Sequence, residues 1–324
     1  MHREAARVTP DPMTKHLKTL DGTRASRLAF GTMQFGDGAD APASRAMFEA
    51  SRERGINHFD TAYLYTEGQS ETLLGQFAAA DRDRLLIATK VGYAGGAGHK
   101  NMIETFEVSR QRLNMDMVDI LYLHRFDPDT DLHETMETFA SLKAGGKIRY
   151  VGLSNFAAWQ VMKAIAIAAK FDLSVDILQP MYNLVKRQAE VEILPMCGDQ
   201  GVACAPYSPL GGGLLTGKYR QGGTGRLTEN NSYAARYGVS WMHTAAGGLA
   251  TLAAEVGTDP ATLAVAWVAA HETGPMPIIS ARSIEQLTPS LAAIDYKLSP
   301  ELYARMAALS PTPPPATDRL EEQA

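Results

Sequence analysis

Four side chains that can carry or transfer protons stand near the ends of three apolar segments in this chain of 324 residues. Asp60 ends the segment INHFD, and Tyr65 follows it in the next loop. Lys90 ends the segment LLIATK, and His124 ends VDILYLH. If the three segments are neighbouring parallel strands, their carboxyl ends meet at one edge, and the four side chains share one site.

The residue types indicate a proton relay. A phenol has a reference pKa of ~10, and a neighbouring ammonium group lowers this pKa by favouring the phenolate. Lys90 could supply that charge to Tyr65, while Asp60 keeps the lysine protonated and oriented. His124 could donate a hydrogen bond to a substrate carbonyl. Because such a relay has no nucleophile, metal or phosphate clamp, it fits hydride transfer to a carbonyl group.

Each of these residues also has an ordinary structural explanation. A lone lysine or aspartate at a strand end is more often part of a surface ion pair, and a lone histidine can be a buried imidazole with satisfied hydrogen bonds. Four such groups at the same edge of three neighbouring strands are harder to explain separately. The combination therefore favours a catalytic site.

Eight almost continuously apolar runs, typical of strands buried on both faces, alternate with amphipathic stretches typical of helices. This alternation predicts a parallel sheet. The runs read LAFGT, INHFD, LLIATK, VDILYLH, IRYVGLSN, VDILQ, VACAPY and MPIISAR, and the amphipathic stretches are 43–55, 70–80, 103–114, 133–144, 157–170 and 283–294. Seven runs end in a polar residue, and these residues are Asp60, Lys90, His124, Asn155, Gln179, Tyr207 and Arg282.

Eight strand-helix units predict a single-domain (β/α)8 TIM barrel, in which the strand ends surround one mouth. A doubly wound sheet is the competing α/β fold, but its glycine fingerprint G-x-G-x-x-G does not occur in the sequence. We expect an N-terminal arm or hairpin at 1–27, the barrel at 28–309 and a flexible tail at 310–324. A capped C-terminal helix is expected in LSPELYARMAAL, at the end of the barrel.

The composition is that of an ordinary globular protein, with 45% apolar residues, 21% charged residues and a net charge of −5. Its scattered basic residues give no reason to expect a nucleic-acid partner. Cys197 and Cys204 lack the spacing of a metal motif, and we expect no metal. Without a signal-peptide core or a membrane span, the expected location is the cytoplasm, with no membrane partner. The sequence leaves the oligomeric state open.

A polar, glycine-rich segment at 211–245 is too long for an ordinary barrel loop. We interpret it as a long loop after the seventh strand that forms a lid, rather than a disordered surface excursion, because it contains several aromatic residues. Residues 212–218 also read G-x-x-x-x-G-K, but Tyr219 stands where a P-loop needs serine or threonine, which argues against a nucleotide triphosphatase. The aromatic residues are Tyr219, Tyr233, Tyr237 and Trp241.

From about Leu28 to Leu309, the motifs resemble those of the aldo-keto reductase superfamily. FDTAYLY followed by EGQSETLLG is similar to the family's first signature, and IATKVG, LYLHRFD, GLSNF, LQPMYN, SPLGGGLLTGK and ISARSIEQL are similar to later ones. The resemblance implies a barrel that binds NAD(P)H without a Rossmann sheet and reduces aldehydes or ketones to alcohols. The implied catalytic residues are Asp60, Tyr65, Lys90 and His124, with Tyr65 as general acid.

The resemblance also implies cofactor contacts. Asn155 and Gln179 would hold the nicotinamide carboxamide, and Tyr207 would stack under the ring. Arg282 would lie near the 2′-phosphate, and its fork suits a phosphate monoester, so NADPH is expected to be preferred, with NADH as a second cofactor. The full implied set is Gly31, Thr32, Met33, Asp60, Ser154, Asn155, Gln179, Tyr207, Ser208, Leu210, Gly212, Lys218, Ser280, Ala281, Arg282 and Gln286.

The sequence departs from the family pattern around the adenosine turn. Ser280 replaces a common glycine, and Pro289-Ser290 replaces a common Glu-Asn pair, which favours weaker adenine contacts and some use of NADH. The expected substrate is a small-molecule carbonyl compound in a largely aromatic and apolar pocket. The residues expected to line that pocket are Met33, Tyr63, Tyr65, Tyr93, His124 and Arg125.

An alternative function is a non-catalytic or weakly catalytic NADP(H)-binding redox sensor or regulatory subunit, a role that potassium-channel β-subunits with this fold partly have. The four acid-base residues favour an enzyme, because a sensor would not need all of them.

Overall fold

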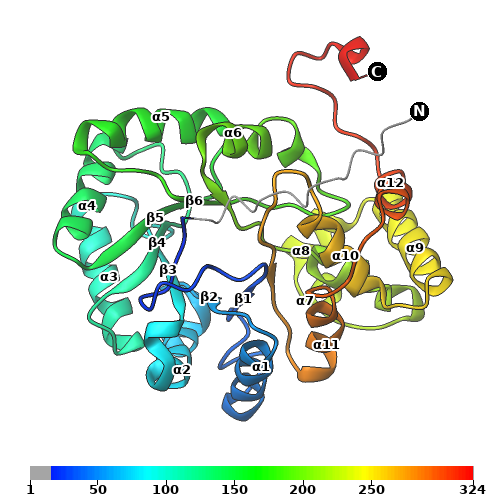
Figure 1. The fold of residues 1–324 in the computed structure, drawn as a ribbon, viewed down its shortest axis with the longest axis horizontal. Coiled ribbons are helices and arrows are strands. Elements are labelled where there is room, and N and C mark those ends of the chain that lie inside the picture. The colour runs from blue at the N-terminus through cyan, green and yellow to red at the C-terminus, as the bar shows by residue number, and fades with distance from the viewer. Residues whose placement is uncertain (1–15, 324) are drawn as a thin grey trace, which may run out of the picture.

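All eight apolar runs contain a strand, and the strands form one parallel sheet surrounded by helices (Figure 1). The computed structural model describes residues 16–323, so most of the expected N-terminal arm lies outside the described residues. Nearly every strand residue is buried, which explains why the runs are continuously apolar. The strands are β1 (Ala29–Gly31), β2 (His58–Asp60), β3 (Leu86–Val91), β4 (Val118–Leu123), β5 (Ile148–Ser154), β6 (Ile177–Gln179), β7 (Ala203–Cys204) and β8 (Ile278–Ile279).

The strand order is β7-β6-β5-β4-β3-β2-β1-β8, so the first and last strands of the chain are neighbours inside the sheet. In the ladder, Asp60 pairs with Ala88, which places Lys90 two residues further along the adjacent strand on the same face. The two edges also approach each other. The backbone N–H groups of Met276 and Ile278 donate to carbonyl oxygens near β7, at 2.8 and 2.9 Å. The sheet is therefore strongly curled.

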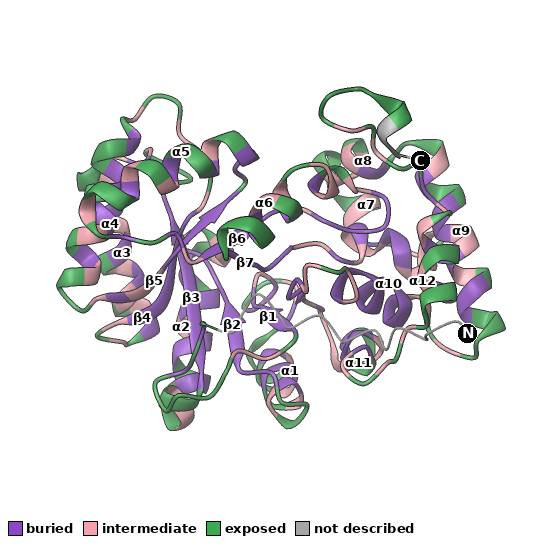
Figure 2. Cartoon of the chain, turned by 45° about the horizontal axis from the view of Figure 1, so that its top comes forward, coloured by how far each residue is buried: buried purple, intermediate pink, exposed green. Residues whose placement is uncertain are grey.

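Helices cover the outside of the sheet, most with one buried face, whereas the helix at Pro260–Ala269 is buried on almost all sides (Figure 2). Several begin with a side chain that caps the first turn, as Asp40, Asp131, Asp259, Ser283 and Ser299 do. The helices are α1 (Ala41–Glu53), α2 (Gln69–Ala78), α3 (His99–Leu113), α4 (Leu132–Ala144), α5 (Ala158–Ala168), α6 (Ile193–Gln200), α9 (Ser240–Glu255), α10 (Pro260–Ala269), α11 (Ile284–Ala292) and α12 (Pro300–Ala307).

The segment 211–245 is not the long irregular loop that the sequence predicts. It contains 3₁₀ helices at Gly211–Thr216 and Lys218–Gln221, the short helices α7 (Arg226–Glu229) and α8 (Asn231–Tyr237), and the start of α9. Asn230 caps α8 by accepting from two backbone N–H groups, and Tyr237 is fully buried. Capping and burial therefore order a segment whose glycine content indicated a loop.

Side chains also fill the space inside the curled sheet, where Ala29, Ala88 and Ile120 surround the large ring of Tyr122. The ring fits because residue 152 is glycine: a Cβ atom there would lie 2.3 Å from the tyrosine ring. His58 is also fully buried, on the same strand face as Asp60. Neither ring nitrogen of His58 has a hydrogen-bond partner among residues 16–323. Burial lowers the pKa of His58 to about 4.

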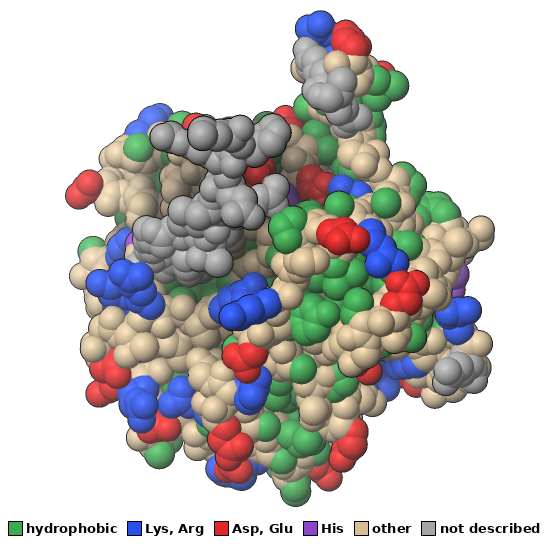
Figure 3. All heavy atoms as spheres, turned by 45° about the vertical axis from the view of Figure 1, so that its right-hand side comes forward, with side chains coloured by type: hydrophobic (Ala, Val, Ile, Leu, Met, Phe, Trp, Pro, Cys, Tyr) green, Lys and Arg blue, Asp and Glu red, His purple; other side chains and the backbone are tan. Residues whose placement is uncertain are grey.

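On the face drawn in Figure 3, Lys and Arg side chains are interspersed with Asp and Glu side chains rather than gathered in one stripe. Cys197 and Cys204 are buried free thiols. In the described part of the chain, no helix is both long and apolar enough to cross a membrane.

The buried His58 should make the protein less stable in acid. Its ordinary pKa is 6.5 and its folded pKa is about 4, so between these pH values the unfolded chain binds a proton that the folded chain does not. The free energy of unfolding therefore falls as the pH falls through this range, by ~3 kcal/mol in total. We expect His58→Leu to remove this loss.

Urea unfolding at neutral pH and near pH 4.5 would measure the difference. An identical pH dependence in the parent protein and in His58→Leu would contradict this assignment.

Candidate active site

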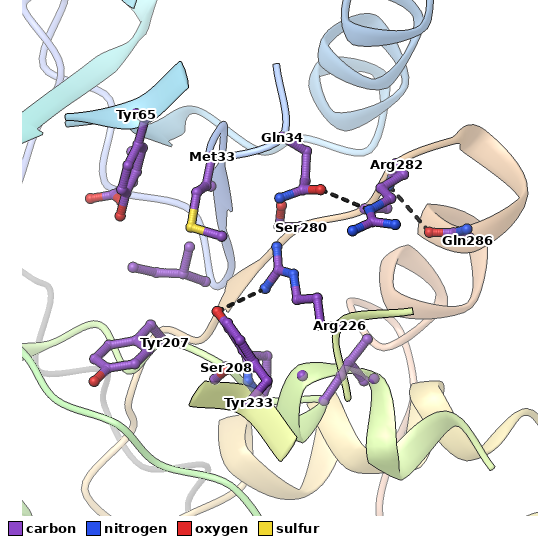
Figure 4. A pocket seen from close by; sticks show the side chains of 18 of the residues that line it. Met33, Gln34, Tyr65, Tyr207, Ser208, Arg226, Tyr233, Ser280, Arg282 and Gln286 are labelled. Atoms are coloured by element: carbon purple, nitrogen blue, oxygen red, sulfur yellow. Dashed lines mark hydrogen bonds between the residues drawn. The ribbon is translucent and has the colours of Figure 1, made fainter. Parts of the chain in front are cut away.

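A cavity of about 930 Å³ opens at the carboxyl ends of the strands and has the size of a small-molecule binding site. Tyr65 and Tyr207 lie toward one end of it, whereas Arg282 and Gln286 lie toward the other (Figure 4). Residues of the strand-end loops form one wall, and residues of the segment 211–245 form the facing wall. The cavity is therefore elongated, with chemically different ends.

At the tyrosine end, the Lys90 ammonium group is fully buried and makes three contacts. It pairs with the Asp60 carboxylate, donates to the Thr61 carbonyl oxygen at 2.8 Å, and lies 3.4 Å from the Tyr65 hydroxyl oxygen. The second Asp60 oxygen accepts a hydrogen bond from Gln179 at 2.9 Å. Residues from three different strand ends thus hold one buried ion pair beside the tyrosine.

The contacts of Lys90 determine its charge. Burial alone lowers the pKa of Lys90, but the nearby Asp60 and Tyr65 outweigh burial and raise it. Burial raises the pKa of Tyr65 above its ordinary value of 10.0, and the Lys90 charge opposes this rise without reversing it. Lys90 therefore lowers the Tyr65 pKa as expected, but burial, to which the Asp60 charge adds, outweighs this effect and leaves the net pKa above its ordinary value. Tyr65 holds its proton at neutral pH.

His124 completes this end of the cavity. Its ring lies edge-on to the rings of Tyr65 and Tyr93, with centroids 6.0 and 5.1 Å away. Burial, assisted by the charges of Lys90 and Arg125, lowers the His124 pKa to about 3. The imidazole is therefore neutral at pH 7 and can donate one hydrogen bond. Its Nδ1 atom has no partner within the described chain.

The next strand ends form a connected polar network. Asn155 adopts a left-handed backbone conformation with φ of 58° and donates to the His124 carbonyl oxygen at 2.9 Å. The Tyr207 hydroxyl donates to the Asn155 side-chain oxygen at 2.7 Å, and Ser154 donates to the Gln179 carbonyl oxygen at 3.0 Å. The Gln179 side-chain amide donates a hydrogen bond to Asp60, so Gln179 also supports the ion pair between Asp60 and Lys90.

The other end of the cavity gathers cations around a partly buried stretch of glycine backbone. Gly212 and Gly213 have φ values of 65° and 94°. Burial, followed by repulsion from Arg282, lowers the pKa of Lys218, which indicates crowded positive charges. Arg226 lies nearby, with its guanidinium group donating to Tyr233 at 3.3 Å (Figure 4). Cations and glycine backbone without side chains, which lets a ligand approach closely, together suit an anionic ligand.

Arg282 is already engaged by other side chains. It donates to the Gln34 side-chain oxygen at 2.9 Å and forms an ion pair of 3.1 Å with Glu229 on α7. The Ser280 hydroxyl nearby is buried and has no partner among residues 16–323. An anion at this end would therefore compete with Glu229 for the guanidinium group and could also accept from Ser280.

Two residues that the sequence analysis assigned to the cavity point elsewhere. The Thr32 hydroxyl is buried and hydrogen bonds with Ser70 at 2.8 Å, and the Tyr63 ring lies beneath the Arg112 guanidinium group. Lys90 lies below the cavity surface, bound to Asp60. The other assigned residues line the cavity: Gly31, Met33, Asp60, Tyr65, Tyr93, His124, Arg125, Ser154, Asn155, Gln179, Tyr207, Ser208, Leu210, Gly212, Lys218, Ser280, Ala281, Arg282 and Gln286.

The sequence analysis did not identify the support of the loop that carries Tyr65. Arg112 on α3 donates to the Tyr63 carbonyl oxygen at 2.9 Å and to the fully buried Glu71 carboxylate at 3.2 Å. Thr89, next to Lys90 in β3, donates to the other Glu71 oxygen at 2.6 Å. A glutamate directly before the leucines of ETLLG was the signal of this network in the sequence.

No cluster of His, Cys, Asp and Glu side chains in the described part of the chain is arranged to hold a metal ion.

Comparisons with known proteins give a consistent picture. A model of the Aldo/keto reductase family matches residues 27–311, which include all eight strands. The chain is 32% identical to the "Probable voltage-gated potassium channel subunit beta" of Oryza sativa subsp. japonica, over 92% of this chain and 96% of that protein. It is 31% identical to the "Uncharacterized oxidoreductase YrpG" of Bacillus subtilis (strain 168), over 90% and 94% respectively. It is 39% identical to "Aflatoxin B1 aldehyde reductase member 2" of Homo sapiens, over 59% and 55%.

The buried Glu71 predicts a measurable stability effect at its partner. Arg112→Met leaves the carboxylate with only Thr89 as a side-chain donor, and breaking a buried ion pair in this way should lower the free energy of unfolding by about 3 kcal/mol. Adding Glu71→Gln to Arg112→Met should recover much of the lost stability, because residue 71 then carries no buried charge.

Lys100→Met is the control on the same helix, because the Lys100 side chain is 87% exposed and its ion pair with Glu104 should contribute less than ~1 kcal/mol. Urea unfolding at neutral pH measures all three variants. An equal, small loss in Arg112→Met and Lys100→Met would show that the Glu71 network does not stabilise the loop.

Proposed function

The chain belongs to the aldo/keto reductase family, and on that premise we propose that it is an NADPH-dependent oxidoreductase that reduces aldehydes or ketones to alcohols. The observation that carries the proposal is the Tyr65 hydroxyl, which faces the cavity 3.4 Å from the buried Lys90 ammonium group and beside the neutral His124. An acid that keeps its proton at neutral pH, next to a group that can stabilise its anion, suits proton transfer to a carbonyl oxygen.

The cavity fits a nicotinamide dinucleotide. Gly212 and Gly213 allow backbone to approach phosphate groups, and Lys218, Arg226 and Arg282 supply positive charge. The Ser280 hydroxyl, which has no hydrogen-bond partner within the described chain, adds a donor beside them. When bound, the reduced nicotinamide supplies the hydride that goes to the carbonyl carbon. NADPH is preferred in this proposal because Arg282 can bind a 2′-phosphate, and NADH is a second cofactor.

Each residue at the tyrosine end then has a defined task. The Tyr65 hydroxyl transfers its proton to the substrate oxygen, and His124 donates a hydrogen bond that orients this oxygen and stabilises its developing negative charge. Lys90 remains protonated and stabilises the phenolate that Tyr65 becomes. Asp60 balances the lysine charge and, with Gln179, fixes its position.

The proposal extends to the architecture and the location. The hydrogen bonds between the segments of β7 and β8 support a closed (β/α)8 barrel. We also propose that residues 28–309 form this barrel as one domain and that the protein acts in the cytoplasm.

A second candidate function is a regulatory subunit that binds NADP(H) with little turnover. The similarity to a protein named "Probable voltage-gated potassium channel subunit beta" favours it, because that similarity extends over 92% of this chain. The arrangement of the four acid-base residues favours the enzyme instead, since a regulatory subunit needs the cofactor site but not the proton donor. Turnover distinguishes the two functions.

Replacing the proton donor should remove the chemistry and keep the cofactor. We expect Tyr65→Phe to lower the rate of aldehyde reduction at least ~100-fold, because general acid catalysis contributes this much or more. Loss of NADPH absorbance with para-nitrobenzaldehyde measures the rate, and fluorescence titration with NADPH measures cofactor binding, which should be nearly unchanged. Full activity in the variant would remove Tyr65 from the proposed role. A parent protein that binds NADPH but reduces no aldehyde or ketone would favour the regulatory subunit.

The direction of the two pKa shifts predicts the pH profile. The Tyr65 pKa lies above 10.0, and the His124 pKa is about 3, so neither group changes its protonation state in the neutral range. We therefore expect kcat/KM for the reduction to stay level from about pH 6 to about pH 9 and to fall only when Tyr65 loses its proton. A falling limb near neutral pH would instead indicate that the Lys90 charge outweighs burial and brings the Tyr65 pKa below its ordinary value.

A further inference from the structure

Arg125 is a cation at the tyrosine end of the cavity that pairs directly with no carboxylate of residues 16–323. It directly follows His124 in the chain, and its exposed side chain lines the cavity together with Tyr93 and Leu64. Among residues 16–323 it forms no ion pair within 4.0 Å. An arginine without a partner beside the proposed proton donor requires a functional explanation.

The nearest acidic residue in the sequence does not neutralise this charge. The Asp127 carboxylate accepts hydrogen bonds from the Ala97 backbone at 2.8 Å, the Thr130 hydroxyl at 2.6 Å and the Asp129 backbone at 3.1 Å. These contacts occupy both Asp127 oxygens, and Asp127 forms no ion pair with Arg125 within 4.0 Å, although the Thr130 hydrogen bond and, more weakly, the Arg125 charge lower the pKa of Asp127. The donors of the Arg125 guanidinium group remain available to a ligand.

The guanidinium group is also oriented. It lies over the Tyr93 ring at 4.6 Å from the centroid, and the same ring packs against His124 at 5.1 Å. Stacking on an aromatic ring restricts the plane of the guanidinium fork, which reduces the entropy lost when two parallel hydrogen bonds form. A carboxylate is the planar anion that matches such a fork.

The other arginine near this end of the cavity, Arg236, lies over the Tyr233 ring at 5.1 Å from the centroid rather than beside His124. Arg282 and Glu229 form their ion pair at the opposite end, where Lys218 and Arg226 also lie and where the cofactor phosphates are proposed to bind. In a chain with a net charge of −5, a local cation is needed to attract an anionic substrate to the tyrosine end.

We propose that Arg125 selects carbonyl substrates that carry a carboxylate, separated from the carbonyl group by an aromatic or apolar spacer. The proposal rests on the reductase function proposed above and names its substrate class. The carbonyl oxygen lies at Tyr65 and His124, the spacer packs against Tyr93 and Leu64, and the carboxylate binds the Arg125 fork. The carboxylate itself takes no part in the reaction: the carbonyl carbon gains a hydride from NADPH and its oxygen gains the Tyr65 proton.

A matched pair of aldehydes tests the inference. Para-carboxybenzaldehyde carries the charge, and its methyl ester has the same aromatic spacer without the charge. We expect the parent protein to show a kcat/KM at least ~10-fold higher for the acid, as a charged hydrogen bond at a partly exposed site allows. Arg125→Met should lower kcat/KM for the acid ~10-fold or more, mainly through KM, and change the value for the ester less than ~3-fold. For Arg125→Lys, kcat/KM for the acid should lie between the values of the parent protein and of Arg125→Met, because an ammonium group keeps the charge but not the fork.

Arg54→Met is the matched control. Arg54 lies outside the cavity, where it pairs with Asp295 on the surface, and its removal changes the net charge by the same amount. Arg54→Met should leave kcat/KM unchanged for both aldehydes. Equal losses for acid and ester in Arg125→Met would overturn the inference and indicate that Arg125 only positions His124 and Tyr93. The absence of any preference in the parent protein would overturn it as well.

If the parent protein reduces neither aldehyde, the proposed reductase function fails, and direct binding decides the inference. Calorimetric titration of para-carboxybenzaldehyde into the NADPH-loaded protein should then show an affinity at least ~10-fold weaker in Arg125→Met, as the loss of a charged hydrogen bond predicts. Equal affinity in the two proteins would overturn the inference.

Discussion

The buried ion pair between Lys90 and Asp60 is the interaction on which the site depends. Moving an ammonium group out of water costs several kcal/mol, and an opposite charge with good hydrogen bonds must offset that cost. Here Asp60, the Thr61 carbonyl oxygen and the Tyr65 hydroxyl surround the lysine. The strand register makes this arrangement possible, because Asp60 pairs with Ala88 and Lys90 lies two residues further along the same face. A lysine one position away would point to the opposite face.

Burial has opposite effects on the protonation of Tyr65 and His124, and both effects suit the same chemistry. It raises the pKa of the tyrosine, which keeps the acidic proton, and lowers the pKa of the histidine, which stays neutral. A charged imidazole would add a second cation beside Lys90, whereas a neutral imidazole can still donate one hydrogen bond. The network of Arg112, Glu71 and Thr89 then links the tyrosine loop to the strand that holds Lys90.

The cavity divides its cations between two ends. At the far end, Lys218, Arg226 and Arg282 lie near the backbone of Gly212 and Gly213, and Glu229 on α7 forms an ion pair with Arg282. At the tyrosine end, Arg125 lies on an aromatic ring without a carboxylate partner. Segment 211–245 supplies one wall of the cavity, so the same helices that bury Tyr237 in the core also bring charged groups to the ligand. Cation placement therefore separates a proposed phosphate region from a proposed substrate region.

The sequence by itself determined the eight strands and their polar ends, because strands buried on both faces need continuous apolar runs and because each run ends where the chain leaves the sheet. It also indicated the grouping of Asp60, Lys90 and His124, which follows from strand order. Only the tertiary structure decided the direction of the Tyr65 pKa, which depends on how completely the phenol is buried. The turn of Tyr63 toward Arg112 likewise reflects a contact between residues far apart in the sequence. Burial and long-range contacts depend on the complete tertiary structure, so local patterns of residues do not predict them.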